Sequence, residues 1–223
     1  MCKMFRLVLI AIPILFTVFV VSGPEFYERA GVSLSCAVIV WLAAGQTLRT
    51  TKWWVIAGLV ISVFGDWFMG HKGDNPTLFI CAIALFFTAH ACFCIFCLVN
   101  GRIHRWFLLV LLMGYLPFFY LVLRPAIPQQ ALMVAVLAYL LVSCVSLAAA
   151  TGLRLPTIVK WTYAVGIALF VFSDTIIALS IFAKYRELDF LILPTYFSTH
   201  VALALALTLM GSFFDGKAKI SKM

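Results

Sequence analysis

Ser62-Val63-Phe64-Gly65-Asp66-Trp67 and Phe170-Val171-Phe172-Ser173-Asp174-Thr175 are two similar stretches, and each places one Asp inside a long apolar run. The next apolar run after each of them contains one His, in Phe87-Thr88-Ala89-His90 and in Phe197-Ser198-Thr199-His200. The two Asp are 108 positions apart, and the two His are 110 apart. Because ionisable side chains are costly inside a lipid bilayer, such residues mark candidate functional sites. The sequence therefore predicts two matching helical hairpins, each with one intramembrane Asp and one intramembrane His.

The composition predicts an all-α, polytopic membrane protein. Of the 223 residues, 65% are hydrophobic and only 11% are charged, and the mean hydropathy is +1.14. The apolar runs are unbroken for about 20 residues, which is the length that a membrane-spanning helix needs. Strands of a membrane barrel would alternate apolar and polar residues instead. We expect a single integral-membrane domain over residues 1–223.

Eight apolar segments are predicted to span the membrane, at 5–22, 32–48, 53–70, 78–99, 106–123, 129–150, 158–182 and 191–214. The first follows Lys3 and Arg6, as a signal peptide would, but its apolar run is long and Val20-Val21-Ser22 is a poor cleavage site, which favours a retained helix. One set of loops holds eleven Lys and Arg and the other set five. Since basic residues favour the cytoplasmic side, both termini are predicted to be cytoplasmic. This loop charge also explains the net charge of +8, so no nucleic-acid partner is expected.

The two hairpins are candidates for an internal repeat of four helices each. With eight spans, the third and seventh segments run in the same direction, as do the fourth and eighth. The predicted halves are residues 1–103 and 104–223, related by an axis near the membrane normal. The alternative is that Phe, Gly, Ser and Thr recur because they are common in membrane helices.

Two carboxyl groups that face one cavity are suited to acid and base chemistry, as in glycosidases and aspartic proteases. Ser62 and Gly65 share a helix face with Asp66, and Ser173 lies beside Asp174. Alternatively, an Asp could simply join two helices by hydrogen bonds. An interhelical hydrogen bond is also an alternative to catalysis for His90, whereas His200, one turn from Tyr196, suits a polar cavity.

Two Asp and two His are possible zinc or iron ligands, but none of the local spacings is a metal-ligand motif, so no metal site is predicted. His90, Cys94 and Cys97 fall on one helical stripe, where the Cys can equally be small apolar residues. Seven Cys without a loop spacing pattern argue against a disulfide framework. No phosphate-binding or dinucleotide-binding motif is present, and no cofactor is expected.

At these residues the sequence resembles the YhhN-like lysoplasmalogenase family of eight-helix membrane proteins. The resemblance is carried by Ser62–Asp66, Phe86–His90, Gly166–Asp174 and Tyr196–His200, of which Gly166–Asp174 is the most specific. The Lys-Pro pair associated with the second helix of the family is absent, and Val32-Ser33-Leu34-Ser35 occupies that region.

The resemblance implies hydrolysis of the vinyl ether bond of lysoplasmalogens, with a lysophospholipid as substrate and membrane lipid as surroundings. Asp66 and Asp174 would act as general acid and as anion, in an order left open, and His90 or His200 would orient a carboxyl group or the water. The expected substrate-binding residues are Ser62, Ser173, Tyr196, Lys184 and Arg186, with Lys72 as a further candidate for the phosphate. A proton-coupled transporter is the main alternative, because buried Asp and His also form proton relays. A metal-dependent lipid amidase or esterase and a purely structural membrane protein are further alternatives.

Overall fold

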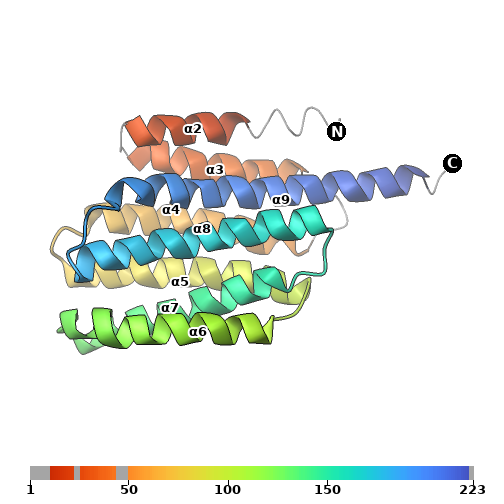
Figure 1. Cartoon of the computed structure of the whole chain (residues 1–223). Helices are drawn as coiled ribbons and strands as arrows, with labels where there is room; N and C mark the ends of the chain where they lie inside the picture. Colours follow the sequence, from red (N-terminus) through yellow and green to blue (C-terminus); the bar gives the residue numbers. More distant parts are fainter. Residues whose placement is uncertain (1–10, 23–25, 44–49, 221–223) are drawn as a thin grey trace.

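The regular elements are helices throughout the residues that the computed structural model describes, which are 11–22, 26–43 and 50–220 (Figure 1). The α-helices are α2 (Ala11–Ser22), α3 (Phe26–Ala43), α4 (Lys52–His71), α5 (Pro76–Val99), α6 (Arg105–Phe118), α7 (Gln130–Thr151), α8 (Thr157–Phe182) and α9 (Ile192–Ile220). A π-helical turn, η2 (Phe119–Leu123), and a 3-10 turn, η3 (Arg124–Ala126), continue α6, and the 3-10 turn η4 (Asp189–Leu191) precedes α9. The predicted all-α class is confirmed.

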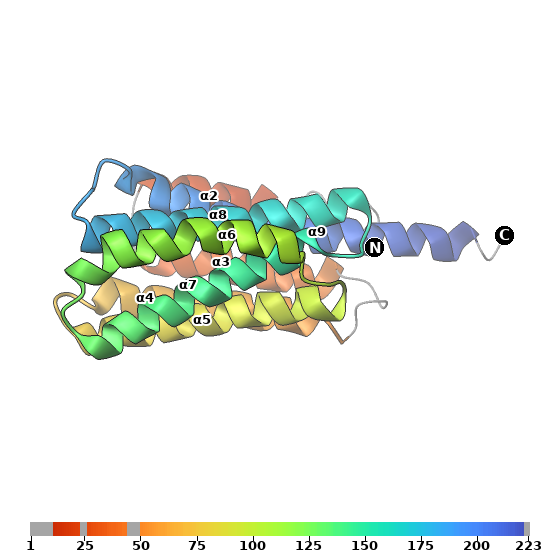
Figure 2. The same ribbon diagram turned by 60° about the horizontal axis from the view of Figure 1, so that its bottom comes forward.

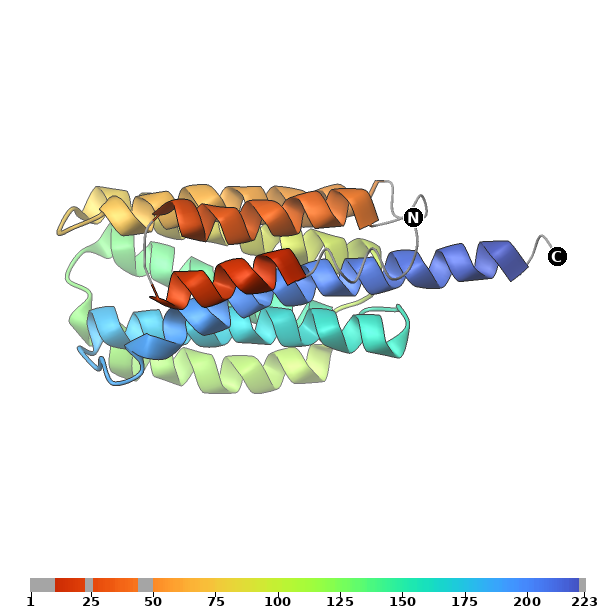
Figure 3. The ribbon, with the colours of Figure 1, turned by 90° about the horizontal axis from the view of Figure 1, so that it is seen from above.

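The helices lie side by side along a common direction and form an elongated bundle (Figures 1 and 3). α4 packs against α5, and α8 packs against α9, as expected of the two predicted hairpins. α7 crosses the bundle obliquely between α5 and α8, and α6 lies on the outside (Figure 2). α9 extends beyond the other helices at one end of the bundle, and the start of α2 points towards the same end (Figure 3).

Six helical stretches are long and apolar enough to cross a membrane: Lys52–His71, Pro76–Val99, Arg105–Ala126, Gln130–Thr151, Thr157–Phe182 and Asp189–Phe213. α3 adds a shorter apolar stretch, Arg29–Ala43, and α2 is described over 12 residues. The start of the expected segment 5–22 and the end of the expected segment 32–48 lie outside the described residues. These helices are those of an integral membrane protein, while the number of eight crossings stays a prediction.

The second helix begins earlier than the sequence predicted. Its expected start was residue 32, but α3 begins at Phe26 and includes Arg29, which the prediction had placed in a loop. The charged side chain had suggested a position outside the membrane. In the structure Arg29 instead lines a cavity inside the bundle, together with Asp66. Because the cavity accommodates this charge, α3 includes Arg29 and begins before it.

The fifth predicted segment, 106–123, corresponds to α6, but its last turn is π-helical. Pro117 lies inside α6 and has no N–H to donate to the preceding turn. The helix widens into η2 directly after it, and Pro125 lies in the tighter turn η3. η2 buries Phe119 and Leu123 in an apolar cluster with residues of α5 and α7. Interruptions of this kind are frequent near functional sites.

The predicted repeat has a counterpart in the order of packing. α3 packs against α4 and α9, and α7, its equivalent in the second half, packs against α8 and α5. Each half thus contributes one helix, α3 or α7, that packs against both hairpins. The repeat itself stays a prediction.

α4 and α5 pack closely because glycines of α4 face aromatic rings of α5. Gly58 lies against Phe93, and Gly65 lies against Phe86. A Cβ atom at Gly65 would stand 2.8 Å from the Phe86 ring, too close for normal contact. Since lipid tails give membrane helices no hydrophobic reason to associate, such close packing is a main source of their attraction. Gly65 therefore fixes Phe86 beside Asp66.

Replacing Gly65 with Ala should destabilise the α4–α5 pair, because overpacking typically costs about 1–3 kcal/mol. Gly70→Ala, on the same helix, is the matched control: no atom lies within 4 Å of its added Cβ. Thermal unfolding in detergent should show a lower Tm for Gly65→Ala and an equal or higher Tm for Gly70→Ala. Equal Tm values for both variants would contradict the close contact with Phe86.

Candidate active site

Asp66 on α4 and Asp174 on α8 line the same cavity, which has a volume of about 350 Å³. The cavity lies between α3, α4, α5, α8 and α9 and is bounded by the segment that precedes α9. Its lining consists of Arg29, Asp66, Met69, Lys72, Phe86, Asp174, Ile177, Ser180, Ile181, Arg186, Asp189, Ile192, Leu193 and Tyr196. The structure thus brings together the two Asp of the predicted hairpins, and it places basic residues with them.

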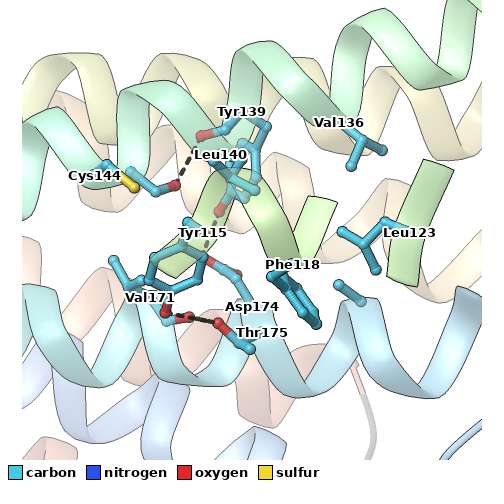
Figure 4. A pocket seen from close by; sticks show the side chains of 12 residues that line it. Tyr115, Phe118, Leu123, Val136, Tyr139, Leu140, Cys144, Val171, Asp174 and Thr175 are labelled. Atoms are coloured by element: carbon cyan, nitrogen blue, oxygen red, sulfur yellow. Dashed lines mark hydrogen bonds between the residues drawn. The ribbon is translucent and has the colours of Figure 1, made fainter. Parts of the chain in front are cut away.

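Asp174 is held by side chains of two neighbouring helices. The Tyr139 hydroxyl on α7 donates a hydrogen bond of 2.6 Å to Asp174 Oδ2, and His90 Nε2 on α5 lies 3.4 Å from the same oxygen. Figure 4 shows Tyr139 pointing at Asp174. The Asp174 side chain is 16% exposed, and the His90 side chain is fully buried. Because a carboxyl group in apolar surroundings needs polar partners, these contacts fix the orientation of Asp174.

Asp66 is 8% exposed and has a different set of partners. The Tyr196 hydroxyl on α9 donates a hydrogen bond of 3.1 Å to Asp66 Oδ2. Arg29 on α3 lines the cavity beside it, and the Arg29 Nε atom is buried with no hydrogen-bond partner among the described residues. Arg29 and Asp66 also line a second cavity of about 230 Å³, together with Phe26, Gly70 and His71. Asp66 therefore lies in the wall between two cavities.

Aromatic rings separate these polar groups from the rest of the bundle. The Phe170 ring stacks on the His90 ring with 4.3 Å between their centroids. It also makes edge contacts with Phe86, at 6.3 Å, and with Tyr196, at 5.3 Å. These rings hold His90 and Tyr196 in place and leave the two carboxyl groups few polar neighbours.

His200 occupies a different position from His90, although their sequence contexts are similar. It is fully buried and does not belong to the cavity lining. Its Nδ1 atom lies 3.4 Å from the Ser33 hydroxyl, and its ring is 4.6 Å from the Tyr196 ring. His90 therefore contacts a carboxyl group directly, whereas His200 reaches Asp66 only through Tyr196.

The predicted hydroxyl groups bind backbone carbonyls. Ser62 donates to the Gly58 carbonyl at 2.9 Å, and Ser173 donates to the Ile192 carbonyl at 3.0 Å, which ties α8 to the start of α9. Ser62 also lies next to the Tyr196 hydroxyl. Both serines are fully buried, and their hydrogen bonds to the backbone stabilise the packing of the helices around the carboxyl groups.

The predicted basic residues divide into two groups. Lys72 and Arg186 line the cavity, as does Arg29. Lys184 is exposed, and it is not among the lining residues. Its backbone has a φ of 59°, so this residue forms part of the turn that leads from α8 to η4.

Sequence reasoning missed two residues of the site, Arg29 and Tyr139. In both cases the sequence has a second polar residue one helical turn later: Ser33 follows Arg29, and Ser143 follows Tyr139. Each pair therefore lies on one face of its helix, which is a pattern that can indicate a polar site. Tyr139 looked like one aromatic residue among many, and Arg29 looked like a loop charge.

Among the described residues, no group of three or more His, Cys, Asp and Glu side chains is arranged to hold a metal ion. Cys94 and Cys97, which share a helical stripe with His90, are buried in the apolar core. His90 instead faces Asp174.

A family model described as the YhhN family matches residues 29–207. The chain belongs to the YhhN family. The matched region includes both Asp, both His, and the residues Arg29 and Tyr139 that complete the site. No curated protein and no solved structure matches the chain.

The hydrogen bond from Tyr139 to Asp174 should contribute measurably to stability. Double-mutant cycles on interhelical hydrogen bonds in membranes give about 0.6 kcal/mol on average and about 1.7 kcal/mol at most. We expect a coupling energy in this range between Tyr139→Phe and Asp174→Ala, measured by unfolding in detergent. The same cycle with Tyr120→Phe, an exposed residue of η2, should give no coupling. Additive effects of Tyr139→Phe and Asp174→Ala would show that the hydrogen bond does not stabilise the fold.

Proposed function

We propose that the protein is a membrane-embedded hydrolase that cleaves the vinyl ether bond of lysoplasmalogens. Its products would be a fatty aldehyde and glycerophosphoethanolamine or glycerophosphocholine. The observation that carries the proposal is the single cavity that is lined by Asp66, Asp174 and three basic side chains. Membership of the YhhN family and the resemblance of its motifs to lysoplasmalogenases support it.

Two carboxyl groups supply what vinyl ether hydrolysis needs. A protonated carboxyl group gives its proton to the alkenyl carbon that does not bear the oxygen, and the electrons of the double bond form the new C–H bond. The positive charge is then shared by the other alkenyl carbon and the ether oxygen, where a nearby carboxylate stabilises it. Water adds to this carbon and loses a proton to a carboxylate. The resulting hemiacetal breaks its C–O bond to glycerol. A carboxylate takes the proton of the hemiacetal hydroxyl group as the aldehyde forms, and the protonated carboxyl group gives a proton to the glycerol oxygen.

The other residues of the site have supporting roles in this proposal. His90 and Tyr139 orient Asp174, and Tyr196 orients Asp66. His200 acts as a positioning residue, because its contact with the site passes through the Tyr196 ring.

The cavity lining also suits a zwitterionic headgroup. Arg29, Lys72 and Arg186 provide positive charge for a phosphate, and a guanidinium group can bind two phosphate oxygens at once. Asp189 lines the same cavity. Its Oδ2 accepts a hydrogen bond from Ser180, and its Oδ1 is buried without a hydrogen-bond partner in the part of the chain that the structure describes. This carboxylate is available to the amine of the headgroup.

The proposed topology follows from the loop charges. With both termini in the cytoplasm, the cavity opens towards the non-cytoplasmic side, where the segments after α4 and α8 lie. The packing of α3 and α7 supports a 4+4 repeat, in which each half contributes one Asp and one partner of the other half's Asp, His90 for Asp174 and Tyr196 for Asp66.

Purified protein in detergent should release aldehyde from an alkenyl lysophospholipid, and Asp66→Asn and Asp174→Asn should each lower the rate by at least about 100-fold, as expected for loss of an acid or base group. Asp74→Asn, in the exposed turn between α4 and α5, should keep the parental rate. A folded parent that releases no aldehyde would refute the proposal. Transport of protons or solutes in sealed vesicles would then become the function to test.

Neutralising the basic side chains should raise the KM for lysophospholipids and leave kcat nearly unchanged. Hydrogen bonds to charged groups are worth about 1.5–3 kcal/mol, which corresponds to a change in KM of about tenfold or more. Arg29→Gln should have a larger effect than Arg186→Gln, because Arg186 is exposed to solvent and its charge is screened. Lys160→Gln, near the opposite end of α8, is the control. An unchanged KM in Arg29→Gln would place the phosphate elsewhere.

A further inference from the structure

Asp174 lies where the polar cavity meets an apolar crevice. The crevice runs between α6, α7 and α8 and has a volume of about 50 Å³ (Figure 4). It is lined by Tyr115, Phe118, Leu123, Val136, Tyr139, Leu140, Ser143, Cys144, Val171, Asp174, Thr175 and Ala178. Asp174 is the one residue that belongs to the linings of both this crevice and the cavity with Asp66.

The crevice extends to both sides of Asp174, whereas the cavity extends to one side only. The cavity continues along α8 towards Ser180 and Ile181, near the end of that helix. The crevice reaches Val171 on α8 and runs along α7 from Val136 to Cys144, a distance of roughly 12 Å at the rise of an α-helix. Its part beyond Asp174, at Val171 and Cys144, leads towards the middle of the bundle, away from the basic residues. Its other part, at Val136 and Ala178, lies on the same side of Asp174 as the cavity.

The crevice borders the most exposed helix of the bundle. α6 has no buried residue, and Met113 on this helix is 77% exposed. Across the crevice, the Tyr115 hydroxyl on α6 and the Thr175 hydroxyl on α8 lie 3.1 Å apart (Figure 4). A molecule in the bilayer can thus reach Asp174 between α6 and α8 once this hydroxyl pair separates.

We infer that the crevice between α6, α7 and α8 binds the first methylenes of the hydrocarbon chain of a single-chain phospholipid. The chain begins beside Asp174 and points towards the bilayer centre, while the phosphate lies in the cavity with Arg29 and Lys72. This placement matches the orientation of a lipid in one leaflet. At about 50 Å³ the crevice holds only the first methylenes of one chain, and the rest of the chain lies in the bilayer beside α6. The inference rests on the proposed function, because it assigns the chain of the same substrate.

A photoreactive lipid tests the placement without any catalytic step. The probe is an alkyl lysophosphocholine with a saturated ether bond and a diazirine in the first part of its chain, added to the protein in lipid nanodiscs. We expect crosslinks on the α6, α7 and α8 peptides that contain Tyr115, Cys144 and Val171, and an excess of the unlabelled lipid should remove them. Labelling that spreads over all lipid-facing helices and resists competition would overturn the inference.

Narrowing the deep end of the crevice tests the same placement through specificity. In Cys144→Leu, kcat/KM for a hexadecenyl substrate should fall at least tenfold, while the value for a butenyl substrate should stay within twofold. Cys81→Leu on α5, which makes the same change outside the crevice, should leave both values unchanged. An equal loss for both chain lengths in Cys144→Leu would contradict the inference.

The two experiments also separate this inference from the proposed function. Crosslinks in the crevice that the unlabelled lipid removes, together with no aldehyde release, would support the lipid site and refute the proposed hydrolase activity. Aldehyde release with crosslinks elsewhere would support the hydrolase activity and refute binding of the hydrocarbon chain in the crevice.

Discussion

The structure depends on the presence of two carboxyl groups inside an apolar bundle. A carboxyl group without partners is expensive in hydrocarbon, so each Asp requires donors from neighbouring helices. Tyr139 and His90 are the hydrogen-bond partners of Asp174, and Tyr196 is the partner of Asp66. These donors come from α5, α7 and α9, and they account for how the hairpins pack: α4 and α8 carry the acids, and the other helices must approach them closely.

The surroundings of the two Asp differ, and the difference explains how one site can serve an amphipathic molecule. Asp66 lies beside Arg29 and between two cavities, at the polar side of the site. Asp174 lies between the polar cavity and an apolar crevice. In a lysoplasmalogen the vinyl ether is the bond at which the polar headgroup portion meets the hydrocarbon chain. The proposed reaction therefore takes place where the lining of the protein changes from polar to apolar.

Much of the fold and part of the site could be predicted from the sequence, because both depend on local patterns. Unbroken apolar runs define the helices from α4 to α9, and the cost of a buried carboxyl group singles out Asp66 and Asp174. The sequence did not predict the start of α3, because a charge such as Arg29 normally ends a membrane helix. Only the folded bundle provides the polar cavity, lined also by Asp66, that accommodates this charge. Tyr139 was missed for a related reason: its hydroxyl matters only because α7 crosses between α5 and α8. The same tertiary contacts decide that His90 reaches a carboxyl group and His200 does not.

The proposed repeat gives this asymmetry a physical basis. Arg29 and Ser33 on α3 stand 110 positions before Tyr139 and Ser143 on α7, and Phe86 stands 110 positions before Tyr196. Equivalent places in the two halves thus hold a cation in one and a phenol in the other. The half with Arg29 accepts negative charge, while the half with Tyr139 supplies a neutral donor to Asp174 and borders the apolar crevice. Two identical halves would give two identical sites; their divergence at these positions creates one site with a polar end and an apolar end.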